Sequence, residues 1–181
     1  MTSGLTFNKF VDYCFLFEPT KTLLALYNKL EGIVIKKTRS ATLHFMETAS
    51  MSTQSIAISI ETKSEHSNNA TNTQLLVWAA AHFQFLLELA ELACISKYQL
   101  DIPVLPLLMI RGRHWYLHIA QLCPNQSGWE IQVHNLPGLY AVDSASGILR
   151  GTAIIPSLLH YAQRVYRPWL EDLAMRIIEA Q

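Results

Sequence analysis

Two charged residues at the end of a strand-like segment could carry phosphate chemistry. Residues 56–61, Ile-Ala-Ile-Ser-Ile-Glu, alternate between isoleucine and smaller or polar residues, which predicts a β-strand with the isoleucines on one face. Because side chains at i and i+2 of a strand point the same way, Glu61 and Lys63 share the other face. Ala57 and Ser59 on that face are small and should leave the carboxylate uncrowded. A carboxylate there could bind Mg²⁺, and an ammonium beside it could stabilise negative charge.

A second carboxylate, Asp12, lies in another strand-like segment, residues 10–17. If that strand lies beside residues 56–61, Asp12 and Glu61 meet near an edge of the sheet and form the paired oxygen ligands that suit Mg²⁺. The metal would polarise a phosphoryl oxygen and lower the pKa of an attacking water. On spacing alone, however, Glu-x-Lys is common at exposed strand ends, and a solvated strand edge is the more economical interpretation.

The elements that must position these residues alternate between strands and helices. Periodicity and turn signals predict helices over 20–31 (closed by Gly32), 73–96 and 156–180, and strands over 105–110, 115–122 and 129–134, with shorter extended pieces at 33–35 and 41–46. Proline should interrupt the last helix near Arg167-Pro168. The isoleucine face of residues 56–61 should pack on the helix that begins near Gln74. This order predicts an α/β (α+β) fold in a single domain spanning residues 1–181.

The charge balance argues against a protein that holds duplex DNA through many phosphates. The chain has 14 basic and 14 acidic residues, and its formal net charge is zero. Neutralisation of phosphates normally supplies most of the affinity for nucleic acid. A local basic patch could still be hidden in a neutral total, but a solvated loop explains the one dense cluster, residues 36–39, equally well. Nucleic acid is therefore disfavoured as a partner.

The cysteines and the apolar segments indicate where the protein resides. Cys14, Cys94 and Cys123 are widely spaced and form no zinc-type pair, which suggests reduced thiols in an intracellular, cytoplasmic protein. No charged segment followed by an apolar stretch opens the chain, so we expect no secretory signal. The longest apolar stretch, residues 75–95, contains several polar side chains and predicts a buried helix rather than a membrane span.

Four aromatic or histidine side chains could line a pocket for a substrate. They are Trp78, His82, Trp115 and His118. Apolar pockets with a few polar groups are the usual small-molecule sites. Packing is the simpler interpretation for each of them, because tryptophans commonly anchor cores and a histidine in an apolar helix is usually hydrogen-bonded there. His118 and His114 are four residues apart on predicted strands, so they do not form a helical metal pair.

The order of several short motifs resembles the fungal branch of the PD-(D/E)XK nuclease-like proteins. The similar segments are Lys9-Phe-Val-Asp12-Tyr-Cys, Ile58-Ser-Ile-Glu61-Thr-Lys63, Gln74-Leu-Leu-Val-Trp78, Ile102-Pro-Val-Leu-Pro106, Gly112-Arg-His-Trp115-Tyr and Val165-Tyr-Arg-Pro168-Trp, and they span residues 9–170. The resemblance implies a restriction-endonuclease-like core, with a mixed central sheet flanked by helices. It also implies that Asp12, Glu61 and Lys63 occupy the family's D…E-x-K positions, with Asp12 and Glu61 as metal ligands. Gln74 matches the glutamine that opens the next helix and contributes to the site in several relatives.

The chain also departs from the family pattern. Relatives place a helix and a strand before the Asp-bearing strand, whereas only eleven residues precede Asp12. Loss of those elements would remove one flank of the site and uncover an apolar face of the sheet. Together with the neutral charge and the half-apolar composition, this predicts a repurposed nuclease fold that binds or converts an apolar small molecule. The resemblance suggests a cofactor-free, cyclase- or isomerase-type step in natural-product biosynthesis.

Two alternatives stay open. One is a Mg²⁺-dependent nuclease, a phosphodiesterase that uses Asp12, Glu61 and Lys63. The other is a non-enzymatic interaction module or a homodimer that covers the exposed apolar face. A shared fold does not decide between these functions, because one fold hosts many activities.

Overall fold

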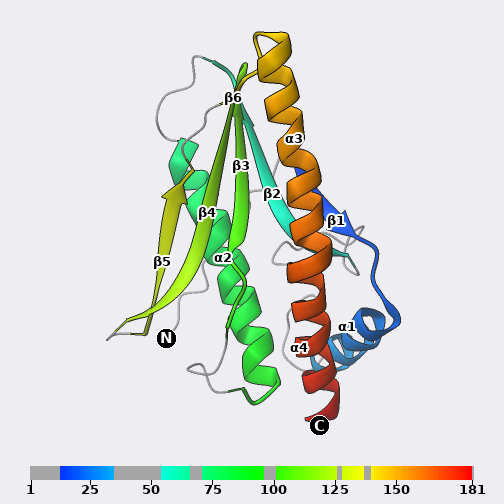
Figure 1. Ribbon diagram of the computed structural model, residues 1–181. Coiled ribbons are helices and arrows are strands. Elements are labelled where there is room, and N and C mark those ends of the chain that lie inside the picture. Colours follow the sequence, from blue (N-terminus) through cyan, green and yellow to red (C-terminus); the bar gives the residue numbers. More distant parts are fainter. Residues whose placement is uncertain are drawn as a thin grey trace.

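The computed structural model describes residues 13–34, 54–65, 71–95, 101–125, 128–136 and 140–180. The elements are β1 (Tyr13–Phe17), α1 (Lys21–Val34), β2 (Ser55–Lys63), α2 (Thr71–Leu92), β3 (Leu105–Arg111), β4 (His114–Asn125), β5 (Gly128–Asn135), β6 (Tyr140–Ala141), α3 (Ala145–Tyr161), η3 (Ala162–Tyr166) and α4 (Arg167–Glu179) (Figure 1). The strands predicted after residue 54 are confirmed, and each is slightly longer than its predicted range. Asp12 and the extended piece predicted at 41–46 lie outside the described residues.

The strands form one mixed sheet. Their order is β1-β2-β3-β4-β5, and the short β6 pairs with β4. β2 is antiparallel to β1 and parallel to β3, whereas β3, β4 and β5 form an antiparallel meander. A tight turn cannot connect parallel neighbours, so the chain between β2 and β3 crosses over through α2 (Figure 1). The α+β architecture predicted from the order of elements is confirmed.

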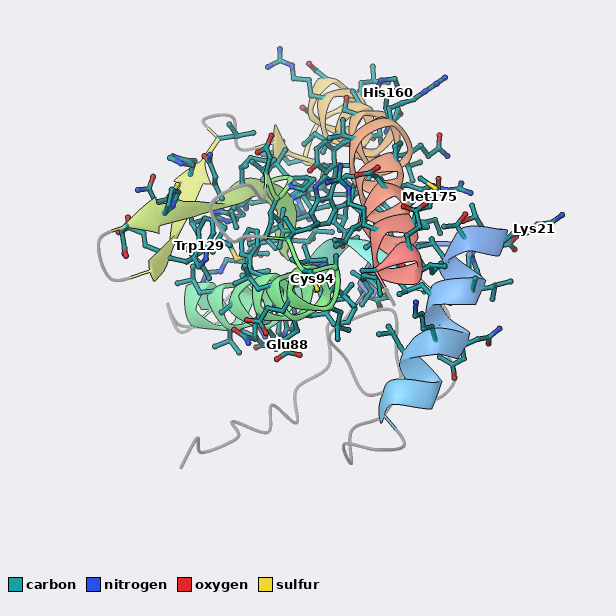
Figure 2. All side chains as sticks on the ribbon, turned by 90° about the horizontal axis from the view of Figure 1, so that it is seen from below. Lys21, Glu88, Cys94, Trp129, His160 and Met175 are labelled. Atoms are coloured by element: carbon teal, nitrogen blue, oxygen red, sulfur yellow. The ribbon has the colours of Figure 1, made fainter. Side chains whose placement is uncertain are left out.

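Helices cover both faces of the sheet, and Figure 2 shows α2 and the α3–α4 helix on opposite sides of the strands. Lys63 donates a hydrogen bond to Gln74 in the first turn of α2, so α2 covers the face that carries Glu61. α3 covers the isoleucine face, where its Gly151 lies against Trp115. The prediction that the isoleucines pack on α2 is therefore wrong. β2 is buried on both faces, so its alternation could not indicate which helix covers which face.

α2 is a core helix with an apolar composition. Its segment Gln74–Leu92 is long and apolar enough to cross a membrane, by length and composition only, and 44% of it is buried inside the structure. Leu75, Trp78, His82 and Leu86 recur on its buried side at intervals of three or four residues. Figure 2 labels Glu88 on the side away from the strands. This distribution is typical of a helix that packs one side on a core.

α3, η3 and α4 form one continuous helix (Figure 1). The side chain of Ser144 caps its start by accepting a hydrogen bond from Gly147 N at 3.1 Å. The predicted start at residue 156 is wrong. The interruption predicted near Arg167-Pro168 takes the form of a π turn over Ala162–Tyr166, through which the helix continues. Pro156 is exposed within α3, and Pro168 follows the π-helical turn η3. The wider π turn relieves the clash that a proline ring makes with the preceding turn of an α-helix.

α1 packs on α4, and a lysine joins the two helices. Lys29 Nζ donates to the carbonyl oxygens of Ile177 and Ile178 at 2.9 and 2.7 Å. A cation at this position complements the partial negative charge of a helix C-terminus. α1 extends past Gly32, so that glycine does not close the helix. The extended piece predicted at 33–35 is wrong for the two of its residues that the structure describes.

Tyr166, the last residue of η3, joins three elements in the core. Its hydroxyl oxygen lies 2.7 Å from Nε2 of His82 in α2. Its ring meets those of Phe17 in β1 and Trp169 in α4, at centroid distances of 6.2 and 6.4 Å. Burial raises the pKa of the Tyr166 hydroxyl, and the neighbouring Tyr161 raises it further. The cluster holds α2 directly against the long helix.

Removing this hydroxyl should weaken the fold. We expect Tyr166→Phe to lower the free energy of unfolding by about 1–3 kcal/mol, because the buried His82 loses a hydrogen bond. Urea unfolding followed by circular dichroism measures the change. Tyr13→Phe is the matched control, since that side chain is 63% exposed and its change should stay within about 0.5 kcal/mol. Equal stabilities of the wild type and Tyr166→Phe would contradict the role of the cluster.

The same hydroxyl should make the fold sensitive to alkaline pH. Its folded-state pKa lies above the ordinary value of 10.0, so the unfolded chain loses this proton first as the pH rises. The contribution to stability is complete below about pH 10 and is lost progressively above it. Urea midpoints measured between about pH 8 and 11 should therefore decline less steeply for Tyr166→Phe than for the wild type. Parallel declines would show that another group controls the alkaline transition.

Candidate active site

Glu61 is fully buried near the end of β2. The strand has neighbours on both sides and helices on both faces, and the Glu61 side chain is 0% exposed. The expectation of an uncrowded carboxylate is wrong, because Ala57 and Ser59 on the same face are buried as well. A carboxylate in such a place requires a cation or several hydrogen bonds to offset the loss of hydration.

Lys63 supplies that cation and links Glu61 to α2. Its Nζ forms an ion pair with Glu61 Oε1 and donates to Gln74 Oε1 at 3.2 Å. The strand period places Lys63 on the face of Glu61, and the crossover brings the first turn of α2 to the same end of the sheet. With 27% of its side chain exposed, Lys63 reaches from the interior to the surface. The structure thus brings together Glu61, Lys63 and Gln74, as predicted.

Asp12, the fourth predicted catalytic residue, lies outside the described residues. The described pairing of β1 with β2 begins at Tyr13, which lies opposite Ile60. It therefore stops one residue short of Asp12 on one strand and one residue short of Glu61 on the other.

The oxygen atoms of this site match the ligands of a hard divalent cation. Glu61 Oε1 and Gln74 Oε1 converge on one positive centre, the ammonium of Lys63. Carboxylate and amide oxygens suit Mg²⁺, whereas softer metals favour sulfur or imidazole. In the part of the chain that the structure describes, no group of three or more His, Cys, Asp or Glu side chains is placed to hold a metal ion. That part supplies one carboxylate of the predicted metal pair, Glu61.

Positive charge gathers at this end of the sheet in spite of the neutral total. Arg111 is the partner of Lys63 in the parallel pairing of β2 with β3, so both side chains lie on one face. Arg113 is exposed in the turn that follows. The N-terminus of α2 adds the partial positive charge of its free N–H groups. Glu61 and Glu65 offset part of this charge, and Glu65 lies against Gly112, between the two arginines. The three basic side chains outnumber these two acidic ones at the described part of this edge.

Three residues predicted to bind a substrate do not meet at a common site. Trp78 and His82 are 2% and 3% exposed in the core. His82 is satisfied by Tyr166, which is the packing role weighed for it from the sequence. Trp115 lies on the opposite face of the sheet, against Gly151 of α3.

His118, the fourth of these residues, does line a hollow. It lies on the α2 side of the sheet, and its Nδ1 is 2.5 Å from Oδ1 of Asn135 on β5. Sequence reasoning missed Asn135. The signal was the tight connection between the two strands, because Asn125 pairs with Gly128 and counting outward from that pair sets His118 opposite Asn135.

Breaking the buried ion pair should lower the free energy of unfolding far more than breaking an exposed ion pair does. We expect Lys63→Met to lower the free energy of unfolding by about 3 kcal/mol, because the Glu61 carboxylate then stays buried without its ammonium. Arg176→Met is the control: it breaks the Arg176–Asp172 pair, whose side chains are 56% and 55% exposed, and should cost less than about 0.5 kcal/mol. Adding Glu61→Gln to Lys63→Met should recover much of the loss. Urea unfolding measures all three, and equal costs for the two single variants would refute the argument.

Comparison with known families agrees with this geometry. A family model described as the PD-(D/E)XK nuclease superfamily matches residues 2–167, a range that includes Asp12, Glu61, Lys63 and Gln74. No curated protein and no solved structure matches the chain. The matched range covers most of the 181 residues and extends from before β1 to the start of α4. The chain therefore belongs to the PD-(D/E)XK nuclease superfamily.

Proposed function

We propose that the protein is a divalent-metal-dependent phosphodiesterase that works through Glu61, Lys63 and Gln74, with Asp12 as the second carboxylate. One observation carries the proposal: the ammonium of Lys63 lies between oxygen atoms of Glu61 and Gln74 at the positively charged end of the sheet. These oxygens can hold a hard cation, and the ammonium can hold a phosphate. Family membership by itself supports the fold and leaves the substrate open.

Each of the three residues has a distinct task in this proposal. Glu61 is a carboxylate fixed in the sheet, and it would hold the metal. Mg²⁺, when bound, would polarise a phosphoryl oxygen and lower the pKa of an attacking water. Lys63 would turn from Glu61 toward the phosphate and stabilise the charge that develops on its oxygens. Gln74 accepts a hydrogen bond from Lys63 and so keeps the ammonium at the site when Glu61 binds the metal.

The charge distribution favours a substrate held mainly at the phosphate that is cleaved. Lys63, Arg111 and the start of α2 provide positive charge at one edge. The net charge of zero offers no surplus for binding many phosphates along a duplex. Short single-stranded oligonucleotides and small phosphodiesters are therefore the proposed substrates, rather than long duplex DNA.

Hydrolysis assays test the proposal directly. With Mg²⁺ or Mn²⁺, the wild type should cleave bis(p-nitrophenyl) phosphate or short oligonucleotides, and EDTA should abolish the reaction. Glu61→Gln and Lys63→Met should each lower the rate by at least about 100-fold, because each removes a group that acts on the metal or on the transition state. Circular dichroism must show that both variants are folded.

An exposed glutamate at the other end of α2 provides the matched control. Glu91 is exposed one residue before the end of that helix, so Glu91→Gln makes the same chemical change outside the proposed site and should leave the rate within about twofold. Full activity in folded Glu61→Gln, or no hydrolysis by the wild type with any divalent metal, would refute the phosphodiesterase.

The other functions considered from the sequence stay predictions. Cyclisation or isomerisation of an apolar natural product finds no support at Glu61, because a carboxylate, an ammonium and an amide make that site polar. Sedimentation at twice the monomer mass would indicate a homodimer, and a strict monomer would count against it.

A further inference from the structure

The two outer strands of the sheet, β1 and β5, differ in how they are protected. β1 has five residues, its pairing with β2 shifts register between Phe15 and Leu16, and Pro19 follows it. β5 has eight residues, keeps one register with β4 throughout, and contains neither proline nor lysine. Bulges, prolines and lysines are the usual means of keeping an edge strand from pairing with another chain. β5 is a long, regular edge strand without them.

The outer side of β5 offers a row of backbone hydrogen-bonding groups. Among the described strands, β5 pairs only with β4 and forms the end of the sheet (Figure 1). Leu136 N donates to Leu117 O at 3.1 Å, and hydrogen-bonded positions alternate along an antiparallel pair. The N–H and C=O groups of every second residue of β5 therefore point away from β4. These residues are Trp129, Ile131, Val133 and Asn135.

The order of side chains makes β5 complementary to an antiparallel copy of itself. With Gln132 facing Gln132 of the copy, Ile131 lies opposite Val133, and Glu130 lies opposite His134. Both members of the second pair are exposed, and Gln132 donates to the Glu130 carboxylate from the same strand at 2.7 Å. An opposite-charge or hydrogen-bonded cross-strand pair stabilises a sheet. This register also engages all four outward-pointing residues of each copy, whereas a shift by two residues leaves one of them beyond the paired region.

The side chains on the α2 side of β5 give the copy a place to dock. A hollow of about 200 Å³ adjoins the Asn135 end of the strand, where Leu76 of α2 is 43% exposed. Trp129 is partly exposed at the other end, away from which α2 runs (Figure 1). In the register centred on Gln132, Trp129 of the copy lies opposite Asn135. Its indole then reaches the open side of the hollow, beside Leu76, and buries a large apolar area there.

We propose that β5 pairs with β5 of a second copy of this chain, antiparallel and centred on Gln132, so that two molecules share one continuous sheet. The two-fold symmetry makes every contact occur twice. A foreign extended peptide could bond to the same backbone groups, but the matched order of Glu130, Ile131, Val133 and His134 favours the chain itself. The interface shares no residue with the site at Glu61, so it is independent of the phosphodiesterase proposal.

A charge exchange tests the pairing of Glu130 with His134. Sedimentation over a series of concentrations should show a dimer of the full-length wild type. Glu130→Lys and His134→Glu should each raise the dimer dissociation constant roughly tenfold, because each places like or unmatched charges opposite one another at two symmetric positions. The double variant restores opposite charges and should return the constant to within about threefold of the wild-type value. Both positions are exposed, and circular dichroism checks that the variants are folded.

Oxidative cross-linking tests the register. Gln132 faces its own copy in a non-hydrogen-bonded pair, where Cα atoms lie about 4.5 Å apart and a disulfide can form. Gln132→Cys should therefore yield a covalent dimer on a non-reducing gel. His134→Cys is the matched control: it makes the same change on the same exposed face, but the two copies of residue 134 are four residues out of register, roughly 13 Å apart. It should link no more than the wild type, which carries the same native cysteines.

Four results would overturn the proposal. They are a wild type that stays monomeric at every concentration, a Glu130→Lys variant that dimerises as tightly as the wild type, a double variant no tighter than the single ones, and equal cross-linking of Gln132→Cys and His134→Cys. Each of them would leave the hydrolysis assays at Glu61 unaffected, so failure of the dimer and failure of the phosphodiesterase are distinguishable.

Discussion

The ion pair between Glu61 and Lys63 links the interior of the sheet to its surface. Glu61 lies on a strand with neighbours on both sides and helices on both faces, where an unpaired charge would destabilise the fold by several kcal/mol. The pair requires Lys63 to lie two residues further along the same face of β2. It also requires Gln74, on α2, to accept a hydrogen bond from the Lys63 ammonium. The end of β2, the start of α2 and the path of the connection between them are therefore coupled to one charge.

The parallel arrangement of β2 and β3 also determines where the first turn of α2 lies. The crossover returns the chain over one face of the sheet, and the first turn of α2 then lies beside the end of β2. Gln74 faces Lys63, while Leu75 and Leu76 reach the hollow beside His118. Adjacent residues of one turn thus contribute to a polar site and to an apolar one. A small rotation of this turn would change both sites together.

The sequence allowed the local arrangement to be predicted better than the long-range one. The period of two in β2 correctly placed Glu61 with Lys63, and the family motif added Gln74. The covering helix for each face of β2 could not be predicted, because a strand buried on both sides has no polar face to distinguish them. The start of α3 was missed because proline is typical of the first position of a helix, whereas Pro156 lies inside α3. Asn135 was missed because cross-strand partners depend on register, which follows from a turn rather than from composition.

The π turn η3 corrects the phase of the longest helix. Buried residues follow one another at intervals of four, at Ile154, Leu158, Ala162, Tyr166 and Leu170. In an ideal α-helix each such interval overshoots a full turn by about 40°, so four intervals would carry the apolar stripe roughly 160° around the axis. The turn with an i to i−5 hydrogen bond, from Arg167 N to Ala162 O, takes in an extra residue and returns the stripe toward the core. Deletion of one residue from η3 would therefore rotate α4 about its own axis: α4 would keep its helical form and present a different side to α1 and α2.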